Sequence, residues 1–305
     1  MQNLERSGDF MRVLVTGSAG QLGTCMVKEL GSDFEVIGLT HSQLDLTDYP
    51  LVMESLARLS PEIVVNCAAY NAVDAAEDQS KEALNLNAFG VQTLARATVE
   101  IGACLVHYST DFVFDGSTNT PYTEEDLPGP LGTYAASKLL GEWFAQDVPR
   151  HYVLRVESLF GGPAPVRRID SLDTSPKSSV SRIVRSILSG REVNVFADRT
   201  VSPSYVVDVV TATRRLIELD APAGIYHCVN SGMATWDVLA LELARLLGHE
   251  ANLVPMTMAK AKLRAKRPVF SALSNAKLER VGVVMPTWQD ALSRFVSVGT
   301  TYGFN

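Results

Sequence analysis

The chain has little cysteine, no long apolar run and no excess of positive charge, and each absence excludes a class of protein. Its four cysteines are far apart and never form a CxxC pair, so we expect reduced thiols rather than a disulfide scaffold or a metal cluster. No run of about 18 apolar residues is present to cross a membrane. The net charge of −7 argues against nucleic-acid binding by the chain as a whole.

The first ten residues lack the apolar core of a signal peptide. We therefore expect a cytoplasmic protein with no membrane partner, and we interpret residues 1–10 as a loose extension because regular patterning starts at Met11.

Charge is unevenly distributed, since residues 150–215 contain ten arginines and one lysine against six acidic residues, a net charge of +5. This span either receives an anionic ligand or presents a solvated helix face.

A glycine-rich turn between a strand and a helix is the most informative feature that is present. Residues 13–16 form a short apolar run, and Gly17, Gly20 and Gly23 follow where an amphipathic segment begins. Gly17 lets the chain reverse, Gly20 lets backbone N–H groups approach a pyrophosphate, and Gly23 lets the helix lie close to the strand. The helix N-terminus adds free N–H groups and a positive dipole end. The GxxGxxG spacing favours dinucleotide binding, although such glycines can also be purely structural.

Strand and helix patterns alternate along the first half of the chain. Apolar runs predict strands at 35–39, 62–69, 104–108 and 152–156, separated by helices at 49–59, at 80–101 and from about Thr133. This alternation favours a doubly wound parallel α/β sheet of the Rossmann type, whose ligands bind at the carboxyl ends of the strands. We predict that this NAD(P)-binding domain covers residues 11–160. Residues 161–305 are then a smaller, mainly substrate-binding lobe, interleaved with the last strands of the sheet.

The second half is less regular. Residues 161–177 are rich in Gly, Pro, Arg and Ser, which predicts a mobile loop. Helices are expected at 179–189, 205–219 and 235–247, and strands at 192–196 and 224–229.

Several single residues receive structural interpretations. His107 and His227 lie in apolar strands and are interpreted as core residues. Trp143, Trp236 and Trp288 are interpreted as packing anchors. The basic run 260–267 is expected to be a solvated helix face, with Arg267 reaching a diphosphate as the alternative.

Tyr134 and Lys138 form the strongest candidate for chemistry. They are four residues apart and so share one helix face. An ammonium group near the phenol would lower the pKa of Tyr134 from about 10 toward neutrality, where tyrosine can exchange a proton with a substrate oxygen. Thr110, at the end of the preceding strand, offers a hydroxyl to the same oxygen.

In this order the motifs resemble the extended short-chain dehydrogenase/reductases, and within them the branch that reduces dTDP-4-dehydrorhamnose. The resemblance rests on VTGSAGQLG, LDLTD, NCAAY, HYSTDFVFDG, YAASKLLGE, the SPSY turn, SGMATWDVLA and RPVFSALSNAKL. It implies reduction of the 4-keto group of a nucleotide-linked deoxysugar, giving dTDP-rhamnose, with NADPH or NADH as cofactor. Thr40 and His41, after the second strand, select neither cofactor.

The resemblance also implies a role for each matching residue. Tyr134 would donate the proton, Lys138 would orient the nicotinamide ribose and the tyrosine, and Thr110 would hold the carbonyl oxygen. The implied cofactor contacts are Gly17, Gly20, Gln21, Leu22 and Gly23 at the pyrophosphate, Asp45 and Leu46 beside the adenine, and Cys67, Ala68 and Ala69 at the third strand. The implied substrate contacts are Asp111, Phe112, Ser158 and Arg267. No metal ligand is implied.

Departures from the family pattern leave alternatives open. Ser158 stands where the family has an aromatic residue, so the sugar is not fixed. Elimination, as in related dehydratases, would need an acid after Asp111, but Phe112 follows. A nucleotide-sugar epimerase, or a non-catalytic subunit like that of methionine adenosyltransferase, stays as an alternative, although the intact Thr110, Tyr134 and Lys138 set argues against a pure binding module. A homodimer is one option for assembly.

Overall fold

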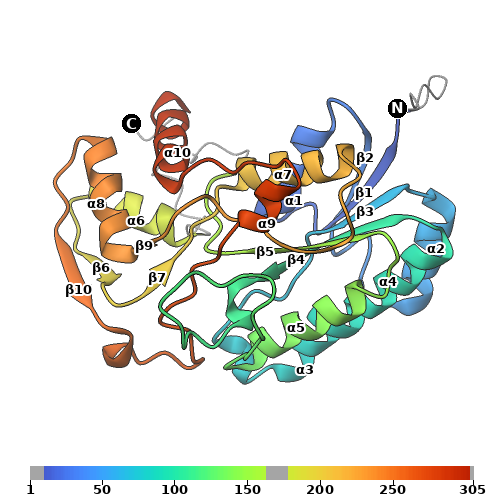
Figure 1. The fold of residues 1–305 in the computed structure, drawn as a ribbon, viewed down its shortest axis with the longest axis horizontal. Coiled ribbons are helices and arrows are strands. Elements are labelled where there is room, and N and C mark those ends of the chain that lie inside the picture. Colours follow the sequence, from blue (N-terminus) through green and yellow to red (C-terminus); the bar gives the residue numbers. More distant parts are fainter. Residues whose placement is uncertain (1–9, 163–177, 303–305) are drawn as a thin grey trace.

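A parallel sheet of six strands forms the centre of the computed structural model, which describes residues 10–162 and 178–302. The strand order is β2-β1-β3-β4-β5-β8 (Figure 1). The strands are β1 (Arg12–Thr16), β2 (Glu35–Leu39), β3 (Ile63–Asn66), β4 (Cys104–Thr110), β5 (His151–Val156) and β8 (Gly224–His227). Every neighbouring pair is parallel. The predicted doubly wound α/β class is confirmed.

Helices cover both faces of this sheet because successive strand residues point to opposite sides. Within β1, Val13 and Val15 join the core beneath α1 (Gln21–Leu30) and α7 (Val206–Glu218). Leu14, between them, joins the core beneath α2 (Tyr49–Leu59) and the helices next to it. Figure 1 shows the two helical layers on opposite sides of the strands.

The helix predicted over 80–101 is continuous but widens in the middle. It consists of α3 (Ser80–Leu84), a π-helical turn η2 (Asn85–Gly90) and α4 (Val91–Glu100). Asn87, in the π turn, donates through its amide to the Ser137 hydroxyl and to the Tyr70 carbonyl. A Cβ on Gly141 would lie 2.3 Å from the Asn87 carbonyl oxygen. Helix α5 (Thr133–Ala145) therefore packs directly against this turn, which fixes the helix that carries the candidate catalytic residues.

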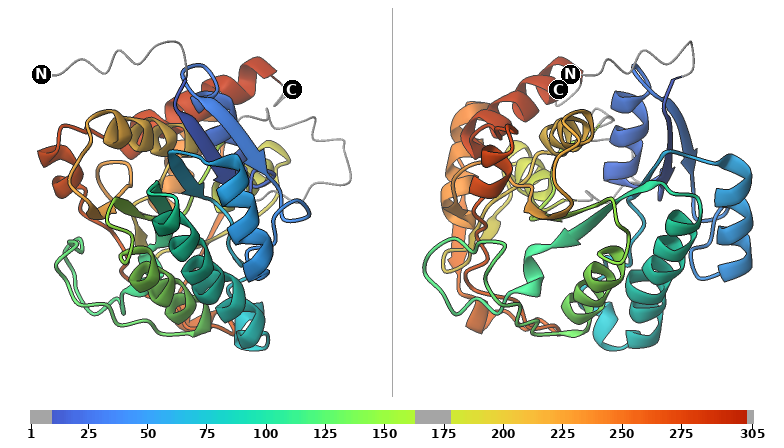
Figure 2. Two further views of the ribbon diagram at one scale, coloured as in Figure 1. Left: turned by 90° about the vertical axis from the view of Figure 1, so that its right-hand side faces the viewer. Right: turned by 45° about the vertical axis from the view of Figure 1, so that its right-hand side comes forward.

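A second hydrophobic cluster is present. It is formed by elements that lie beside the main sheet (Figure 2). Its elements are α6 (Ser179–Leu188), β6 (Val193–Phe196), α8 (Trp236–Leu247), β10 (Leu253–Met256) and α10 (Trp288–Tyr302). Strand β10 pairs in parallel with β6, and β7 (Thr200–Val201) pairs antiparallel with β9 (Ala234–Thr235). Between these parts the chain returns to the main sheet as α7 and β8. The division into an NAD(P)-binding domain and a substrate lobe stays a prediction.

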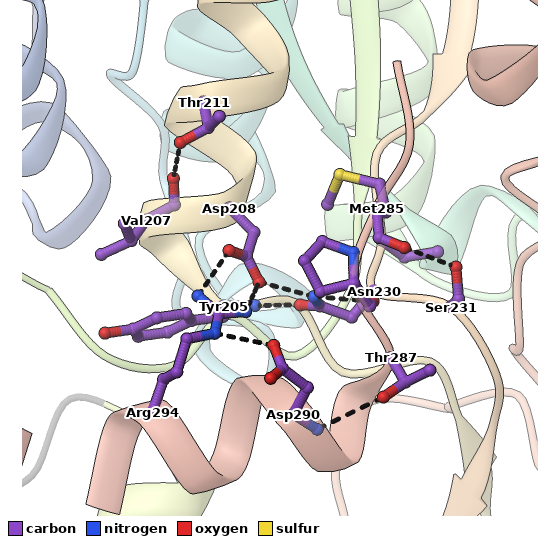
Figure 3. A network of polar contacts seen from close by, with 12 residues as sticks. Tyr205, Val207, Asp208, Thr211, Asn230, Ser231, Met285, Thr287, Asp290 and Arg294 are labelled. Atoms are coloured by element: carbon purple, nitrogen blue, oxygen red, sulfur yellow. Dashed lines mark hydrogen bonds and ion pairs between the residues drawn. The ribbon is translucent and has the colours of Figure 1, made fainter. Parts of the chain in front are cut away.

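A polar network joins α10 to the start of α7. Arg294 donates two hydrogen bonds to the Asp208 carboxylate, at 2.8 and 2.7 Å. Asn230 donates to the same carboxylate at 2.6 Å and accepts the backbone N–H of Tyr205. Figure 3 shows these groups converging between the two helices. Because the bidentate pair is partly buried, it fixes the geometry of the C-terminal helix.

The remaining elements are short: η1 (Ala75–Glu77), η3 (Asp111–Val113), η4 (Met258–Lys260) and α9 (Ala276–Arg280). Within the described ranges, we find no helix with both the length and the apolar character that a membrane span requires. Two segments, 1–10 and 161–177, are expected to be loose. Most of each, residues 1–9 and 163–177, lies outside the described residues.

The predictions for single core residues are mostly confirmed. His107 and His227 are fully buried, and Trp236 and Trp288 are nearly so. The prediction for Trp143 is wrong, because its side chain is 59% exposed. Helix α5 packs through the face that carries Lys138, Glu142 and Ala145, and Trp143 points well away from the centre of that face.

His227 should make stability depend on pH. Burial lowers its pKa to about 3, helped by Arg155, whereas an unfolded histidine titrates near 6.5. Below about pH 6.5, His227 therefore binds a proton in the unfolded chain but stays neutral in the folded chain. The free energy of unfolding falls as the pH drops toward 3. We expect the difference in unfolding free energy between wild type and His227→Gln to shrink by about 2 kcal/mol from pH 6.5 to 5.

Urea unfolding at several pH values tests this expectation. The exposed His249 provides the matched control, since His249→Gln should leave the pH dependence of the wild type unchanged. A His227→Gln protein whose stability has the same pH slope as the wild type would contradict the assignment.

Candidate active site

A cavity of about 340 Å³ lies at the carboxyl ends of the central strands. The strand order places β1 between β2 and β3, and ligands of doubly wound sheets bind where the order reverses in this way. The predicted site residues that line the cavity are Gly20, Gln21, Leu22, Cys67, Ala68, Ala69, Thr110, Asp111, Tyr134, Lys138 and Ser158. Those that do not line it are Gly17, Gly23, Asp45, Leu46, Phe112 and Arg267.

Sequence reasoning missed eight further lining residues: Asn66, Asn71, Tyr108, Ser109, Val156, Leu159, Ser178 and Ser179. Four of them lie within the last three residues of β3, β4 or β5, so the rule that ligands bind at strand ends could have found them. Ser178 and Ser179 carried no comparable signal, because they do not follow a predicted strand.

The glycine turn has the shape of an anion cradle. Gly17 has φ +63°, and a Cβ there would lie 2.7 Å from the Ala68 nitrogen. A Cβ on Gly23 would lie 2.3 Å from the Gly17 carbonyl oxygen. Gly20 is the N-cap residue of α1 and has no side chain to accept a hydrogen bond. The first N–H groups of the helix therefore receive no side-chain acceptor from it. These features fit a pyrophosphate at the helix N-terminus.

The three candidate catalytic residues meet deeper in the cavity. Thr110 ends β4, and its hydroxyl donates to Asp111 Oδ1 at 3.0 Å. Tyr134 and Lys138 lie on α5, as predicted. The Lys138 ammonium is 3% exposed and donates to the Tyr108 carbonyl at 2.5 Å. Burial lowers the pKa of Lys138 to about 8.

The expected lowering of the Tyr134 pKa is wrong. Burial is the largest influence and raises this pKa, while a hydrogen bond with Thr110 works in the opposite direction. The ammonium of Lys138 donates to the Tyr108 carbonyl and does not offset the effect of burial on the Tyr134 pKa. Tyr134 is therefore a neutral phenol at neutral pH, which is the form that a proton donor needs.

The family model described as RmlD substrate binding domain matches residues 11–300. The chain belongs to this family. Relatives support the assignment over nearly the whole length. A dTDP-4-dehydrorhamnose reductase of Sinorhizobium fredii is 33% identical over 298 residues, which cover 94% of this chain and 97% of the relative. A probable dTDP-4,6-dihydroxy-2-methyloxan-3-one 4-ketoreductase of Streptomyces antibioticus is 35% identical, covering 92% and 93%.

A solved structure of an RmlD-type protein has the same fold. The dTDP-4-dehydrorhamnose reductase of Bacillus anthracis, crystallised in complex with NADP, superimposes with a TM-score of 0.86 at 30% identity. The alignment covers 94% of this chain and 99% of that one. The resemblance inferred from the motifs is thus confirmed.

Asp45 and Leu46 of this RmlD-family chain lie away from the cavity. Leu46 is 1% exposed and packs in the core under α2. The Asp45 carboxylate accepts the backbone N–H and the hydroxyl of Thr47, and these hydrogen bonds lower its pKa. Their expected place beside an adenine stays a prediction.

The basic run 260–267 is not a helix, so that prediction is wrong. Only Met258–Lys260 is helical, as a single 3-10 turn. Arg264 pairs with Asp78, and Arg267 donates to Asp74 at 3.0 and 2.7 Å. This pairing lowers the pKa of Asp74 to about 2. Arg267 ties the C-terminal segment to the loop after β3 and does not reach into the cavity.

Two buried charged residues behind the cavity were also missed. Arg199 lies 5.1 Å above the Phe112 ring and 3.7 Å from Asp111 Oδ2. Glu157 is 1% exposed and accepts the backbone N–H of Ser202 at 2.6 Å. The only sequence signal for Glu157 was an acidic residue directly after the apolar run of β5. The neighbouring Ser158 stood out instead, because it departs from the family pattern.

A second cavity of about 330 Å³ lies between α6, β6 and Trp236. Arg182 and Arg199 line it, so part of the positive charge of residues 150–215 does face a cavity. The Nε atom of Arg199 and the Nε1 atom of Trp236 are buried without a hydrogen-bond partner among the described residues. A bound acceptor would satisfy both donors.

Proposed function

We propose that this chain reduces the 4-keto group of dTDP-4-dehydrorhamnose to give dTDP-rhamnose, with NADPH or NADH as the reductant. The observation that carries the proposal is one cavity that joins the glycine turn of α1 to Thr110, Tyr134 and Lys138. The names of the Sinorhizobium and Streptomyces relatives support a 4-keto sugar linked to dTDP. The NADP complex of the Bacillus relative supports NADPH.

The chemistry divides between the cofactor and the protein. A bound nicotinamide supplies the hydride for the sugar carbonyl carbon. Thr110 and Tyr134 hold the carbonyl oxygen with two hydroxyls, and Tyr134 gives its proton to that oxygen as negative charge develops. Lys138, with a pKa of about 8, is largely charged at neutral pH, and in this proposal it orients the nicotinamide ribose.

The nucleotide end of the substrate has a place in the same proposal. The second cavity adjoins the first through Arg199, which contacts Asp111 on one side and lines the cavity beside Trp236 on the other. Arg182 and Arg199 supply positive charge for a diphosphate, and Trp236 supplies an indole N–H and an apolar surface for a base. We assign the dTDP moiety to this cavity.

Nicotinamide oxidation tests the function. Purified protein is mixed with NADPH or NADH and enzymatically prepared dTDP-4-dehydrorhamnose, and the near-ultraviolet absorbance of the reduced nicotinamide is followed. We expect a loss of absorbance that requires both protein and sugar, and competitive inhibition by dTDP. An epimerase would instead retain its cofactor through purification and give no net oxidation, and a regulatory subunit would co-purify with a synthetase.

The partner in this proposal is the small nucleotide sugar. A cytoplasmic location, the lack of a nucleic-acid partner and a homodimer stay predictions. Gel filtration with light scattering would decide the last of these.

A further inference from the structure

A buried pair of carboxyl groups lies behind the proposed proton donor. Asp111 is 3% exposed and Glu157 is 1% exposed, and hydride transfer with proton donation by Tyr134 uses neither of them. Asp111 reaches the cavity wall, whereas Glu157 does not. The two groups come from different elements, since Asp111 begins η3 and Glu157 follows β5.

A continuous line of hydrogen-bonding groups joins this pair to Tyr134. The Tyr134 phenol is hydrogen-bonded to Thr110. The Thr110 hydroxyl is 3.0 Å from Asp111 Oδ1. The carboxyl group of Asp111 lies against that of Glu157, close enough for one proton to join them. Three contacts therefore lead from the phenol to the innermost acid.

The surroundings hold Glu157 in place. The backbone N–H of Ser202 donates to Oε2 at 2.6 Å, and the Ser271 hydroxyl donates to Oε1. Ser271 also contacts Asp111. These bonds fix the position of Glu157 without adding positive charge.

Charge and hydrogen bonding indicate that the pair holds one proton. Arg199 is the cation that contacts it, 3.7 Å from Asp111 Oδ2. The charge of Arg267 also acts on Arg199, but Arg267 is paired with Asp74. Two carboxylates against one guanidinium would leave an uncompensated buried charge. Asp111 Oδ2 is also buried without a hydrogen-bond donor in the part of the chain that the structure describes. A proton on the neighbouring acid supplies that donor and balances the charge.

The titration properties agree with this geometry. Burial raises the pKa of Asp111, and it raises the pKa of Glu157 well above its usual range. The negative charge of Asp111 is the second influence on Glu157, while Arg199 favours the ionised form of Asp111. The shared proton therefore resides mainly on Glu157.

We propose that Asp111 and Glu157 hold a shared proton that reloads Tyr134 through Thr110 after each turnover. The proposal rests on the proposed reductase function. The hydride of the nicotinamide forms the new C–H bond, and the Tyr134 proton neutralises the sugar oxygen. The Thr110 hydroxyl, which donates to Asp111 Oδ1 before turnover, turns toward the phenolate and gives it this proton. The proton of the acid pair then moves from Glu157 to Asp111 and from Asp111 to the Thr110 oxygen. The pair is left doubly ionised beside Arg199 and regains a proton from water at Asp111, which lines the cavity.

Glu157→Gln tests the proposal by separating the first turnover from the later ones. Tyr134 already carries its proton when the first hydride is transferred, so the single-turnover rate should stay within about twofold of the wild type. Steady-state kcat should fall by about tenfold or more, and rapid mixing should show a burst of one nicotinamide oxidised per active site. Because reloading must then come from solvent, kcat of the variant should rise as the pH is lowered.

Glu124→Gln is the matched control. Burial also raises the pKa of the Glu124 carboxyl, and it also accepts a backbone N–H, from His227, but it has no contact with Thr110. This variant should show wild-type kcat and no burst.

Either of two results for Glu157→Gln would overturn the proposal. Equal losses in the single-turnover rate and in kcat would show that Glu157 only supports the site, and no loss in either would show that the pair carries no catalytic proton. A wild type that oxidises no nicotinamide with the keto sugar would instead refute the reductase function itself.

An infrared difference spectrum keeps the proposal testable if the variant is unstable. At neutral pH, wild-type protein should show the C=O band of a protonated carboxyl, and this band should disappear at a pH high enough to ionise the pair. Exchange into heavy water should shift the same band. A wild-type spectrum with no protonated-carboxyl band at neutral pH would contradict the shared proton.

Discussion

Replacing Tyr134 with phenylalanine is expected to lower kcat by about two to four orders of magnitude, the usual value of a positioned general acid. The variant loses only the phenol oxygen, because the ring keeps its edge-to-face contact with Phe112, whose centroid lies 5.9 Å away. Burial keeps the wild-type phenol protonated, and the variant has no phenol to give a proton to the carbonyl oxygen. Cofactor affinity should be nearly unchanged.

Two measurements check this expectation: kcat from nicotinamide oxidation, and the cofactor Kd from fluorescence titration. Tyr70→Phe is the control, because that hydroxyl donates to Gln79 and Tyr70 does not line the cavity. Wild-type turnover in Tyr134→Phe would defeat the assignment of the proton donor. A large rise in cofactor Kd would show that Tyr134 serves binding rather than chemistry.

Removing the Glu142 carboxylate is expected to lower the free energy of unfolding by about 3–5 kcal/mol. Glu142 on α5 accepts two hydrogen bonds from Arg155 on β5, at 2.9 and 2.7 Å, and both side chains are 2% exposed or less. Ser109 also donates to the carboxylate, at 2.5 Å. Glu142→Leu would leave the Arg155 guanidinium buried without its partner, and that desolvated charge dominates the cost.

Urea denaturation of a double-mutant cycle measures the pair. Glu142→Leu combined with Arg155→Met should recover much of the lost stability, because neither charge is then buried alone. Glu242→Ala is the control: it breaks a bidentate pair with Arg245 that is 68% exposed on the arginine side, and should cost at most about 1 kcal/mol. Equal costs for Glu142→Leu and Glu242→Ala would contradict the argument from burial.

The fold was predictable because its signals are local. The apolar runs at 35–39, 104–108 and 152–156 match β2, β4 and β5 closely, and their alternation with helices predicts the parallel sheet. The glycine turn was predictable for the same reason, since strand, turn and helix occupy one short stretch. Tyr134 and Lys138 follow from helical spacing.

Contacts between distant segments were not predictable from the sequence. The Tyr134 pKa differs from expectation because folding buries the phenol, and the Lys138 ammonium donates to the Tyr108 carbonyl on β4. Arg267 is held by Asp74, 193 residues earlier. Glu157 meets Asp111 only once β4 and β5 lie side by side. Such contacts between distant segments leave no periodic pattern in a single sequence.

Transfer of deuterium from the cofactor to the sugar tests the central claim most directly. The protein would be incubated with dTDP-4-dehydrorhamnose and nicotinamide cofactor carrying deuterium at the transferable position, and the product would be examined by NMR. We predict dTDP-rhamnose with one deuterium on C4 of the sugar and none elsewhere. A sugar without deuterium at C4, with the label retained on the cofactor, would contradict the assignment of this chain as a 4-keto sugar reductase.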